Sequence, residues 1–136
     1  DDENTGRLTR VGSIVGTAPY MSPEQCRADE VDQRSDIFSL GVVLYELISG
    51  QRPFLGRTVG EIINAIVNQT PASLGLESPL YAPTLDGIIF KCLEKEPARR
   101  YASAKALMED LARLRQVIDQ PVPAAKPHGA FPRPSP

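Results

Sequence analysis

The chain has 136 residues, of which 41% are hydrophobic and 24% are charged, and its formal net charge is −2. These are the values of a globular domain rather than a disordered chain, and they give no electrostatic reason to expect nucleic acid or a membrane surface as a partner. No apolar run approaches the roughly 18 residues that a membrane span needs. Cys26 and Cys92 lie far apart and away from His128, so we expect reduced thiols and no zinc site.

The first 15 residues are polar and have no helical or strand period, which predicts a loop. The chain starts at Asp1 rather than at methionine, and we expect it to be a piece of a larger protein. Next comes GTAPYMSPEQ, residues 16–25. Its two prolines restrict their own φ and favour extended geometry in the residues before them. The segment is predicted to be stiff, with one short helical turn beginning at Pro23.

The segment SDIFSLGVVLYELISG, residues 35–50, is the clearest helix. Ser35 or Asp36 can cap its start, and Gly50 is a natural residue to end it. Because the segment is apolar almost all round, it should be buried on every side, as the central post of an α-rich domain. On this interpretation Val43 is a core residue, and so is Leu47.

Three amphipathic helices are predicted after the central one, following a loop in which Phe54 looks exposed. The first covers residues 58–68, the second is capped by Thr84, and the third is capped by Ser103. The last helix should bury one face, made of Leu107, Met108, Leu111 and Leu114.

The composition changes abruptly to a proline-rich one near the end of the chain. Such a sequence is typical of an extended, semi-rigid linker. Residues 118–136 are therefore interpreted as a linker or tail that follows the folded part.

Three separated motifs resemble those of the eukaryotic-type Ser/Thr protein kinases, in the order and rough spacing of that family's large lobe. GTAPYMSPE, residues 16–24, is similar to the end of an activation segment, which commonly reads GTxxYxxPE. DIFSLG, residues 36–41, resembles DxWSxG with phenylalanine for tryptophan, and EPARR, residues 96–100, resembles the DPxxR turn with glutamate for aspartate. The first motif and RYASA look most like the bacterial members. The resemblance covers residues 1–117 and implies a mainly α fold, a C-terminal kinase lobe that starts in the activation loop.

Other kinase motifs are missing from the chain: it has no Gly-rich phosphate loop, VAIK-type lysine, HRDxxxxN or DFG. In the family these precede the activation segment, and phosphoryl transfer depends on them and on Mg²⁺. The resemblance therefore implies a whole protein that uses ATP and Mg²⁺ to phosphorylate protein Ser or Thr. The 136 residues alone should bind neither and should be inactive. Their partners would be a protein substrate and the N-terminal part of the same kinase, in the cytoplasm or on a membrane anchor beyond the tail.

The resemblance also implies a role for each matched residue near the substrate. Gly16, Thr17, Tyr20 and Met21 would form the floor under the residue that follows the phosphorylated one (the P+1 floor). Thr17 would also support the catalytic aspartate, which lies outside this chain. Glu46 would meet Tyr20 under the peptide and attract basic substrate side chains.

Further matched residues would be structural. Glu24 would pair with Arg100 in a buried ion pair, for which Arg99 is the neighbouring alternative. Asp36 would accept backbone hydrogen bonds from the catalytic loop. Pro23 and Gly41 would also have structural roles.

The polar loop at the start of the chain is where activating phosphorylation occurs in the family. The resemblance points to Thr9 there, with Thr5 and Ser13 as lesser candidates. A phosphate brings about two negative charges, which can order a loop against arginines.

Two other functions stay open. A pseudokinase, whose upstream half lacks the catalytic aspartate or lysine, would be an interaction protein. An unrelated helical binding module would carry chance matches and would keep Glu24 and Arg100 far apart. Plainer roles also exist for single residues: a turn at Gly16 and Thr17, a helix cap at Asp36, a solvated Glu46. The central helix should lack neighbours in the isolated chain, which predicts exposed apolar surface and aggregation.

Overall fold

The computed structural model describes residues 16–75 and 84–119, and this part of the chain is helical, without a strand. The mainly α fold expected from the sequence is therefore confirmed. In chain order the elements are the 3₁₀ turn η1 (Ala18–Tyr20), α2 (Pro23–Cys26), α3 (Gln33–Ser49), α4 (Val59–Asn68), α5 (Leu85–Cys92), the 3₁₀ turn η2 (Pro97–Arg99) and α6 (Ala104–Asp119). The predicted N-terminal loop with Thr5, Thr9 and Ser13, and the tail beyond α6, lie outside the described residues.

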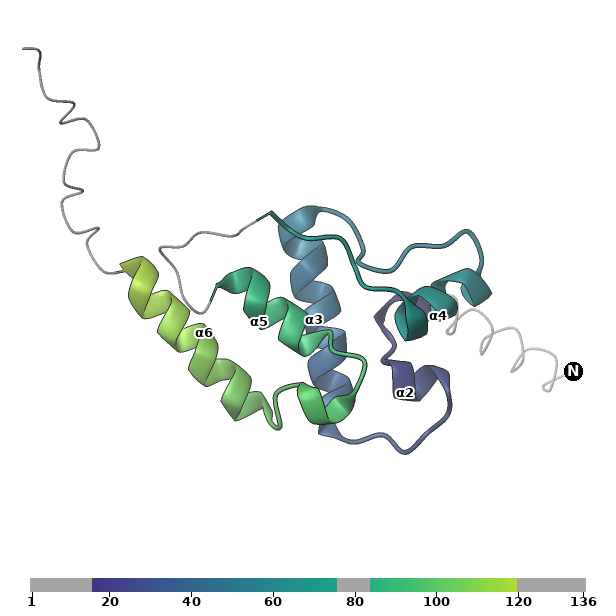
Figure 1. Cartoon of the computed structure of the whole chain (residues 1–136), viewed down its shortest axis with the longest axis horizontal. Coiled ribbons are helices and arrows are strands. Elements are labelled where there is room, and N and C mark those ends of the chain that lie inside the picture. Colours follow the sequence, from purple (N-terminus) through teal and green to yellow (C-terminus); the bar gives the residue numbers. More distant parts are fainter. Residues whose placement is uncertain (1–15, 76–83, 120–136) are drawn as a thin grey trace, which may run out of the picture.

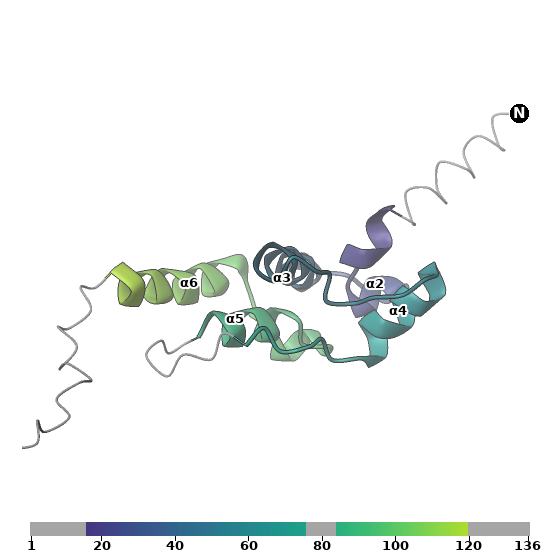
Figure 2. The same cartoon turned by 90° about the horizontal axis from the view of Figure 1, so that it is seen from above.

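Helix α3 lies in the middle of the molecule (Figure 1). Helix α5 packs across it and is followed by α6 on one side, whereas α2 and α4 pack together on the other. Figure 2 shows α3 nearly end-on between these two groups. Among the described residues, no helix is long and apolar enough to cross a membrane.

Side-chain caps explain where most of the helices begin. Thr84 accepts a hydrogen bond from the backbone N–H of Gly87 at 3.0 Å, and Ser103 accepts one from Ala106 at 3.1 Å, as predicted. Thr58 caps α4 in the same way. Helix α3 ends at Gly50, whose φ of 74° is in the left-handed region that glycine tolerates best.

The predicted start of α3 was wrong by two residues. Asp32 is its N-cap and accepts a hydrogen bond from the backbone N–H of Arg34 at 2.9 Å. The helix therefore begins at Gln33, and Ser35 and Asp36 are already in its first turn. The earlier carboxylate caps the helix because it lies where the chain is still extended.

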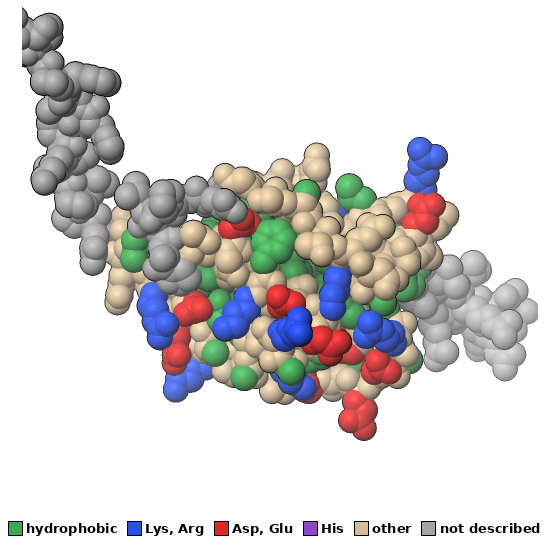
Figure 3. Space-filling view, in the orientation of Figure 1, with side chains coloured by type: hydrophobic (Ala, Val, Ile, Leu, Met, Phe, Trp, Pro, Cys, Tyr) green, Lys and Arg blue, Asp and Glu red, His purple; other side chains and the backbone are tan. Residues whose placement is uncertain are grey.

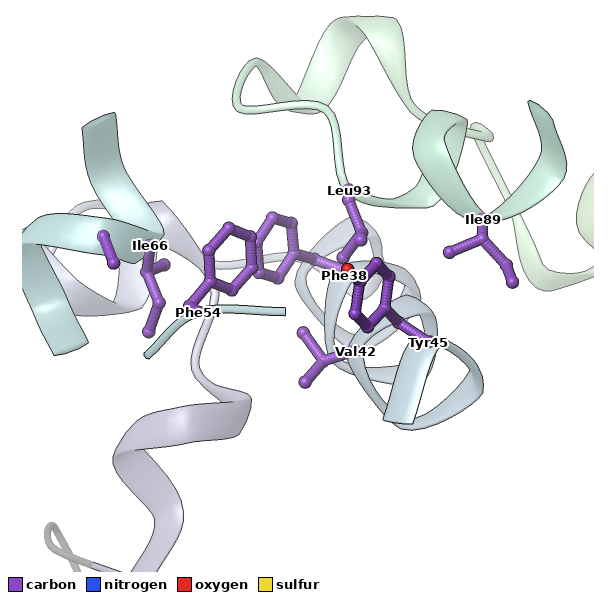
Figure 4. Close-up of a cluster of buried hydrophobic side chains, with 8 residues drawn as sticks. Phe38, Val42, Tyr45, Phe54, Ile66, Ile89 and Leu93 are labelled. Atoms are coloured by element: carbon purple, nitrogen blue, oxygen red, sulfur yellow. The ribbon is translucent and has the colours of Figure 1, made fainter. Parts of the chain in front are cut away.

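The larger part of the core lies between α3, α4 and α5. Phe38 and Val42 from α3 meet Ile66 from α4 and Ile89 from α5 (Figure 4). The loop residue Phe54 stacks on Phe38 with ring centroids 5.7 Å apart. Phe54 is only 1% exposed, so the prediction that it is exposed was wrong: its ring fills the space between α3 and α4.

A second core cluster lies between α3, α5 and α6 and includes Ile88, Leu107 and Leu114. Met108 is 61% exposed and does not belong to the buried face predicted for α6. It is one position past Leu107, about 100° around the helix, and faces away from α5. Cys92 is a buried free thiol of this cluster, and burial raises its pKa to about 12, which makes it unreactive.

One face of α3 is not buried, which contradicts the prediction that the helix is covered on every side. Leu40, Val43 and Leu47 are 41%, 39% and 75% exposed. Their spacing of three and four residues places them on one stripe, and Asp36, one turn earlier, is exposed on the same stripe. We call these four residues the α3 stripe. No described segment packs over it, so Val43 and Leu47 are not core residues in this chain.

Candidate functional site

The segment that precedes α2 is held against α3. Ala18 and Pro19 are buried, Tyr20 and Met21 are half-buried, and Gly16 is exposed. The extended geometry expected before a proline is present at Ser22, which precedes Pro23 and has ψ 161°. It is absent at Ala18, which precedes Pro19 and lies in the 3₁₀ turn η1, so the expectation was wrong there. Ser39 of α3 donates a hydrogen bond to the backbone oxygen of Tyr20. Thr17, also exposed, lies just before η1.

Tyr20 and Glu46 are in direct contact, as the resemblance implies. The Tyr20 hydroxyl donates a hydrogen bond of 2.8 Å to Glu46 Oε2, across 26 residues of sequence. Glu46 is half-buried rather than fully solvated. The guanidinium of Arg52 lies 5.8 Å from the centroid of the same ring. Sequence reasoning missed Arg52, because an arginine in a loop gives no signal until its neighbours are known.

Helix α2 starts with a reciprocal cap. The Ser22 hydroxyl accepts from the Gln25 backbone N–H at 3.2 Å, and the Gln25 side chain accepts from the Ser22 backbone N–H at 2.9 Å. Pro23 is the first helical residue, where its missing N–H has no cost. This short turn presents the carboxylate of Glu24 to the interior, and Glu24 is only 5% exposed.

Glu24 and Arg100 form the buried ion pair that the motifs predict. Arg100 Nη1 lies 2.6 Å from Glu24 Oε2, and Nη2 lies 2.7 Å from Oε1, so the contact is bidentate. The remaining donors of Arg100 reach backbone oxygens of Arg34, Glu94 and Lys95 at 3.0, 2.7 and 3.1 Å. All five N–H groups of the guanidinium are thereby used, which offsets the cost of burying its charge. Arg99 is exposed and takes no part.

Two serines complete this buried network. Ser35 donates a hydrogen bond of 2.8 Å to Glu24 Oε2, and Ser22 donates one of 3.0 Å to the Ser35 hydroxyl. Burial raises the pKa of Glu24, but the hydrogen bonds from Arg100 and Ser35 outweigh it and lower the pKa to about 2. The carboxylate therefore stays charged. Sequence reasoning missed both serines in this network, because Ser35 looks like a helix cap and nothing local links Ser22 to it.

The turn that carries Arg100 is also tied to α4. Lys95 donates a hydrogen bond to the backbone oxygen of Ile66, and its ammonium lies 4.2 Å from the centroid of the Phe54 ring. The Arg100 guanidinium lies 5.0 Å from the Phe38 ring. One polar turn thus joins α2, α3 and α4 around the stacked aromatic pair of Figure 4.

Gly41 lies where α5 comes closest to α3. A Cβ atom built on it would lie 2.6 Å from Cys92 Cβ, a distance that real Cβ atoms essentially never show. A residue without a side chain is therefore required for α5 to pack at this distance. The glycine of the DIFSLG motif has a packing role in this structure.

Comparison with known proteins decides which family these features belong to. Residues 3–111, about four fifths of the chain, match the model of the protein kinase domain. This chain belongs to the protein kinase family. The kinase chain is 38% identical over 109 residues to the serine/threonine-protein kinase PknB of Mycolicibacterium smegmatis, and 42% identical over 108 residues to a serine/threonine-protein kinase of Corynebacterium efficiens.

These matches cover most of this kinase chain but little of its relatives. The aligned part is 80% of the chain and 17% of the M. smegmatis protein, and 79% and 20% for the C. efficiens protein. A probable serine/threonine-protein kinase of Streptomyces coelicolor is 36% identical over 124 residues, 91% of the chain and 18% of that protein. The kinase chain is therefore similar to a bacterial-type C-terminal lobe. An unrelated helical module is excluded.

Proposed function

We propose that the chain provides the P+1 floor and the helical scaffold of a Ser/Thr protein kinase that transfers the γ-phosphate of ATP to protein Ser or Thr. The observation that carries this proposal is that the later part of the floor and the turn directly after it are fixed. Tyr20 is held by Glu46 of α3, and Glu24, four residues later, is held by Arg100. A peptide substrate needs a floor that is already ordered, because ordering it on each encounter would cost roughly 1–2 kcal/mol per residue in backbone entropy.

Under this proposal Gly16, Thr17, Tyr20 and Met21 contact the peptide around the P+1 position. Glu46 is half-buried and keeps a carboxylate at the edge of the floor, where it attracts basic side chains of the substrate. Thr17 supports the catalytic aspartate. Phosphorylation of Thr9, or of Thr5 or Ser13, orders the loop before the floor.

The α3 stripe supports the proposal that the N-terminal part of the same kinase covers this surface. Asp36 heads the stripe with an exposed carboxylate that can accept backbone hydrogen bonds from a catalytic loop. Leu40, Val43 and Leu47 below it offer an apolar surface for that segment. We propose that residues 1–117 belong to one partial kinase domain, which the N-terminal part completes, and that the rest of the chain is a linker. Helix α6 continues to Asp119, two residues past this predicted boundary of 117/118.

We assign the binding of ATP and Mg²⁺ to the N-terminal part, and none of it to this chain. The sequence lacks the motifs that hold the phosphates. Within residues 16–75 and 84–119, no group of three or more His, Cys, Asp or Glu side chains is placed to hold a metal ion. We propose that the chain alone is inactive, and that the whole protein is cytoplasmic or is held by a membrane anchor beyond the linker.

Reconstitution tests the proposal. The chain and the polypeptide encoded upstream of it are expressed separately and together, and transfer of labelled phosphate from ATP to Ser, Thr and Tyr peptides is measured. Transfer to Ser or Thr only when both are present is the expected result. Transfer to Tyr alone would contradict the proposal.

A pseudokinase is the second candidate, since nothing in the described residues distinguishes an active partner from an inactive one. In that case the two polypeptides form a stable complex that transfers no phosphate. An upstream sequence without the catalytic aspartate or the β3 lysine would decide for the pseudokinase, and one with HRD and DFG would decide against it.

A further inference from the structure

Arg52 carries an exposed positive charge at the edge of the proposed floor. It lies in the loop between α3 and α4, and the central carbon of its guanidinium lies over the Tyr20 ring, 5.8 Å from the ring centroid. This is within the range of a cation–π contact. Among the described residues, Arg52 pairs with no carboxylate, although Glu46 contacts the hydroxyl of the same ring.

The loop that presents Arg52 is anchored on both sides. Before it, the Ser49 hydroxyl donates a hydrogen bond of 2.8 Å to the backbone oxygen of Gln51 and accepts one of 3.1 Å from its N–H. After it, Pro53 is buried and Phe54 is 1% exposed in the core. Pro53 also restricts Arg52 to extended backbone geometry. The backbone that carries Arg52 is thus fixed before any substrate arrives, which lowers the entropy lost on binding.

We propose that Arg52 is a specificity-determining residue that selects protein substrates with an acidic side chain close to the phosphorylated Ser or Thr. This inference rests on the proposed function, because it places the peptide over Tyr20. The guanidinium lies over the Tyr20 ring and pairs with no described carboxylate, so its N–H groups can donate to a carboxylate of the substrate. Asp and Glu side chains are the peptide groups that match these donors.

The overall charge of the chain would not by itself produce a preference for acidic substrates. The net charge of the chain is −2, and Figure 3 shows acidic and basic side chains interspersed over the face it presents. Attraction of an acidic peptide must therefore be local. Arg52 and Glu46 place opposite charges at the face and at the hydroxyl of one ring, so the substrate side chain near Arg52 differs in charge from the one near Glu46.

The test uses the full-length kinase and serine peptides in which one glutamate is moved through the positions around the acceptor. Each is compared with the peptide that has glutamine at the same position. We expect kcat/KM to be about fivefold higher with glutamate at one position, the size of an exposed charge pair. High salt should reduce this ratio because it screens the pair. Arg52→Ala should bring the ratio to about one. Arg52→Glu should bring it below one and should favour a peptide with lysine at the same position.

Arg57 provides the matched control, because it is exposed in the same loop and has no ring contact among the described residues. Arg57→Ala should leave the ratio unchanged. A wild-type ratio near one, a ratio that survives Arg52→Ala, or an equal loss in Arg57→Ala would each overturn the inference while the proposed function stands. Failure to phosphorylate any peptide would overturn the proposed function, and this inference with it.

Discussion

Arg100 holds both carboxylate oxygens of Glu24, a residue 76 positions earlier in the chain, and both side chains are almost fully buried. The contact joins the turn after the floor to the turn after α5, and both side chains also bond to the first turn of α3. Ser35 adds a third hydrogen bond to the same carboxylate. Because both charged side chains are buried, water cannot solvate one of them if the other is removed. The geometry of this part of the lobe therefore depends on the intact pair.

Removing the charge of Glu24 should destabilise the chain strongly. Glu24→Gln leaves the Arg100 guanidinium buried without its counter-charge, and we expect a loss of about 3–5 kcal/mol in the free energy of unfolding. Urea unfolding at low protein concentration measures this loss. Glu96→Gln, at an exposed position in the same turn as Arg100, should change the stability by less than about 0.5 kcal/mol. Equal effects of the two variants would refute the buried pair.

Stability should also fall in acid because of this one carboxylate. The pKa of Glu24 is lowered from 4.5 to about 2 in the folded chain, so below pH 4.5 the unfolded state binds a proton that the folded state does not. The contribution of Glu24 is therefore present above pH 4.5 and is lost as the pH falls toward 2. Urea midpoints across this range check it. The slope should be shallower in Glu24→Gln, and an identical slope would count against the assignment.

Phe54 and Leu55 are adjacent in the chain but differ in burial, 1% against 65% exposed. Phe54→Ala removes the ring that stacks on Phe38 and should cost about 3–5 kcal/mol through lost burial and a cavity. Leu55→Ala should change the stability by less than about 0.5 kcal/mol. Thermal unfolding of the two variants separates these outcomes; a similar shift in both would mean that the loop does not close over the core.

Two helical glycines should respond in opposite directions to alanine. Gly41→Ala pushes α5 away from α3, since the new Cβ would lie 2.6 Å from that of Cys92, and should cost about 1–3 kcal/mol. Gly60→Ala in α4 meets nothing closer than 3.9 Å and should be neutral or stabilise by up to about 1 kcal/mol. Denaturant midpoints measure both, and tolerance of alanine at Gly41 would argue against the close approach.

The isolated chain should self-associate through the α3 stripe. Replacing Val43 and Leu47 by serine removes apolar side chains that are 39% and 75% exposed, and should shift the chain toward the monomer. Sedimentation or light scattering gives the oligomeric state. Met108→Ser changes a side chain that is 61% exposed on α6 and should not have this effect. A chain that is already monomeric, with a sharp cooperative melt, would contradict the prediction.

Local signals in the sequence were enough for the helices and their caps. Thr84, Ser103 and Gly50 act within one turn of their own position, so their roles can be read from neighbouring residues. The ion pair of Glu24 and Arg100 was predictable only through the family motifs, because nothing local links residues so far apart. The roles of Thr17, Tyr20, Met21 and Glu46 toward a substrate remain proposals.

The sequence by itself therefore determined the helical class, most of the element boundaries and the kinase resemblance, since periodicity, caps and motifs are short-range properties of the chain. Only the tertiary structure decided which apolar residues are buried. Phe54 is covered because α4 folds back over it, and Val43 and Leu47 are exposed because no described segment packs on their side of α3. Burial is a relation between segments distant in sequence, and hydrophobicity alone does not specify which side of a helix finds a neighbour.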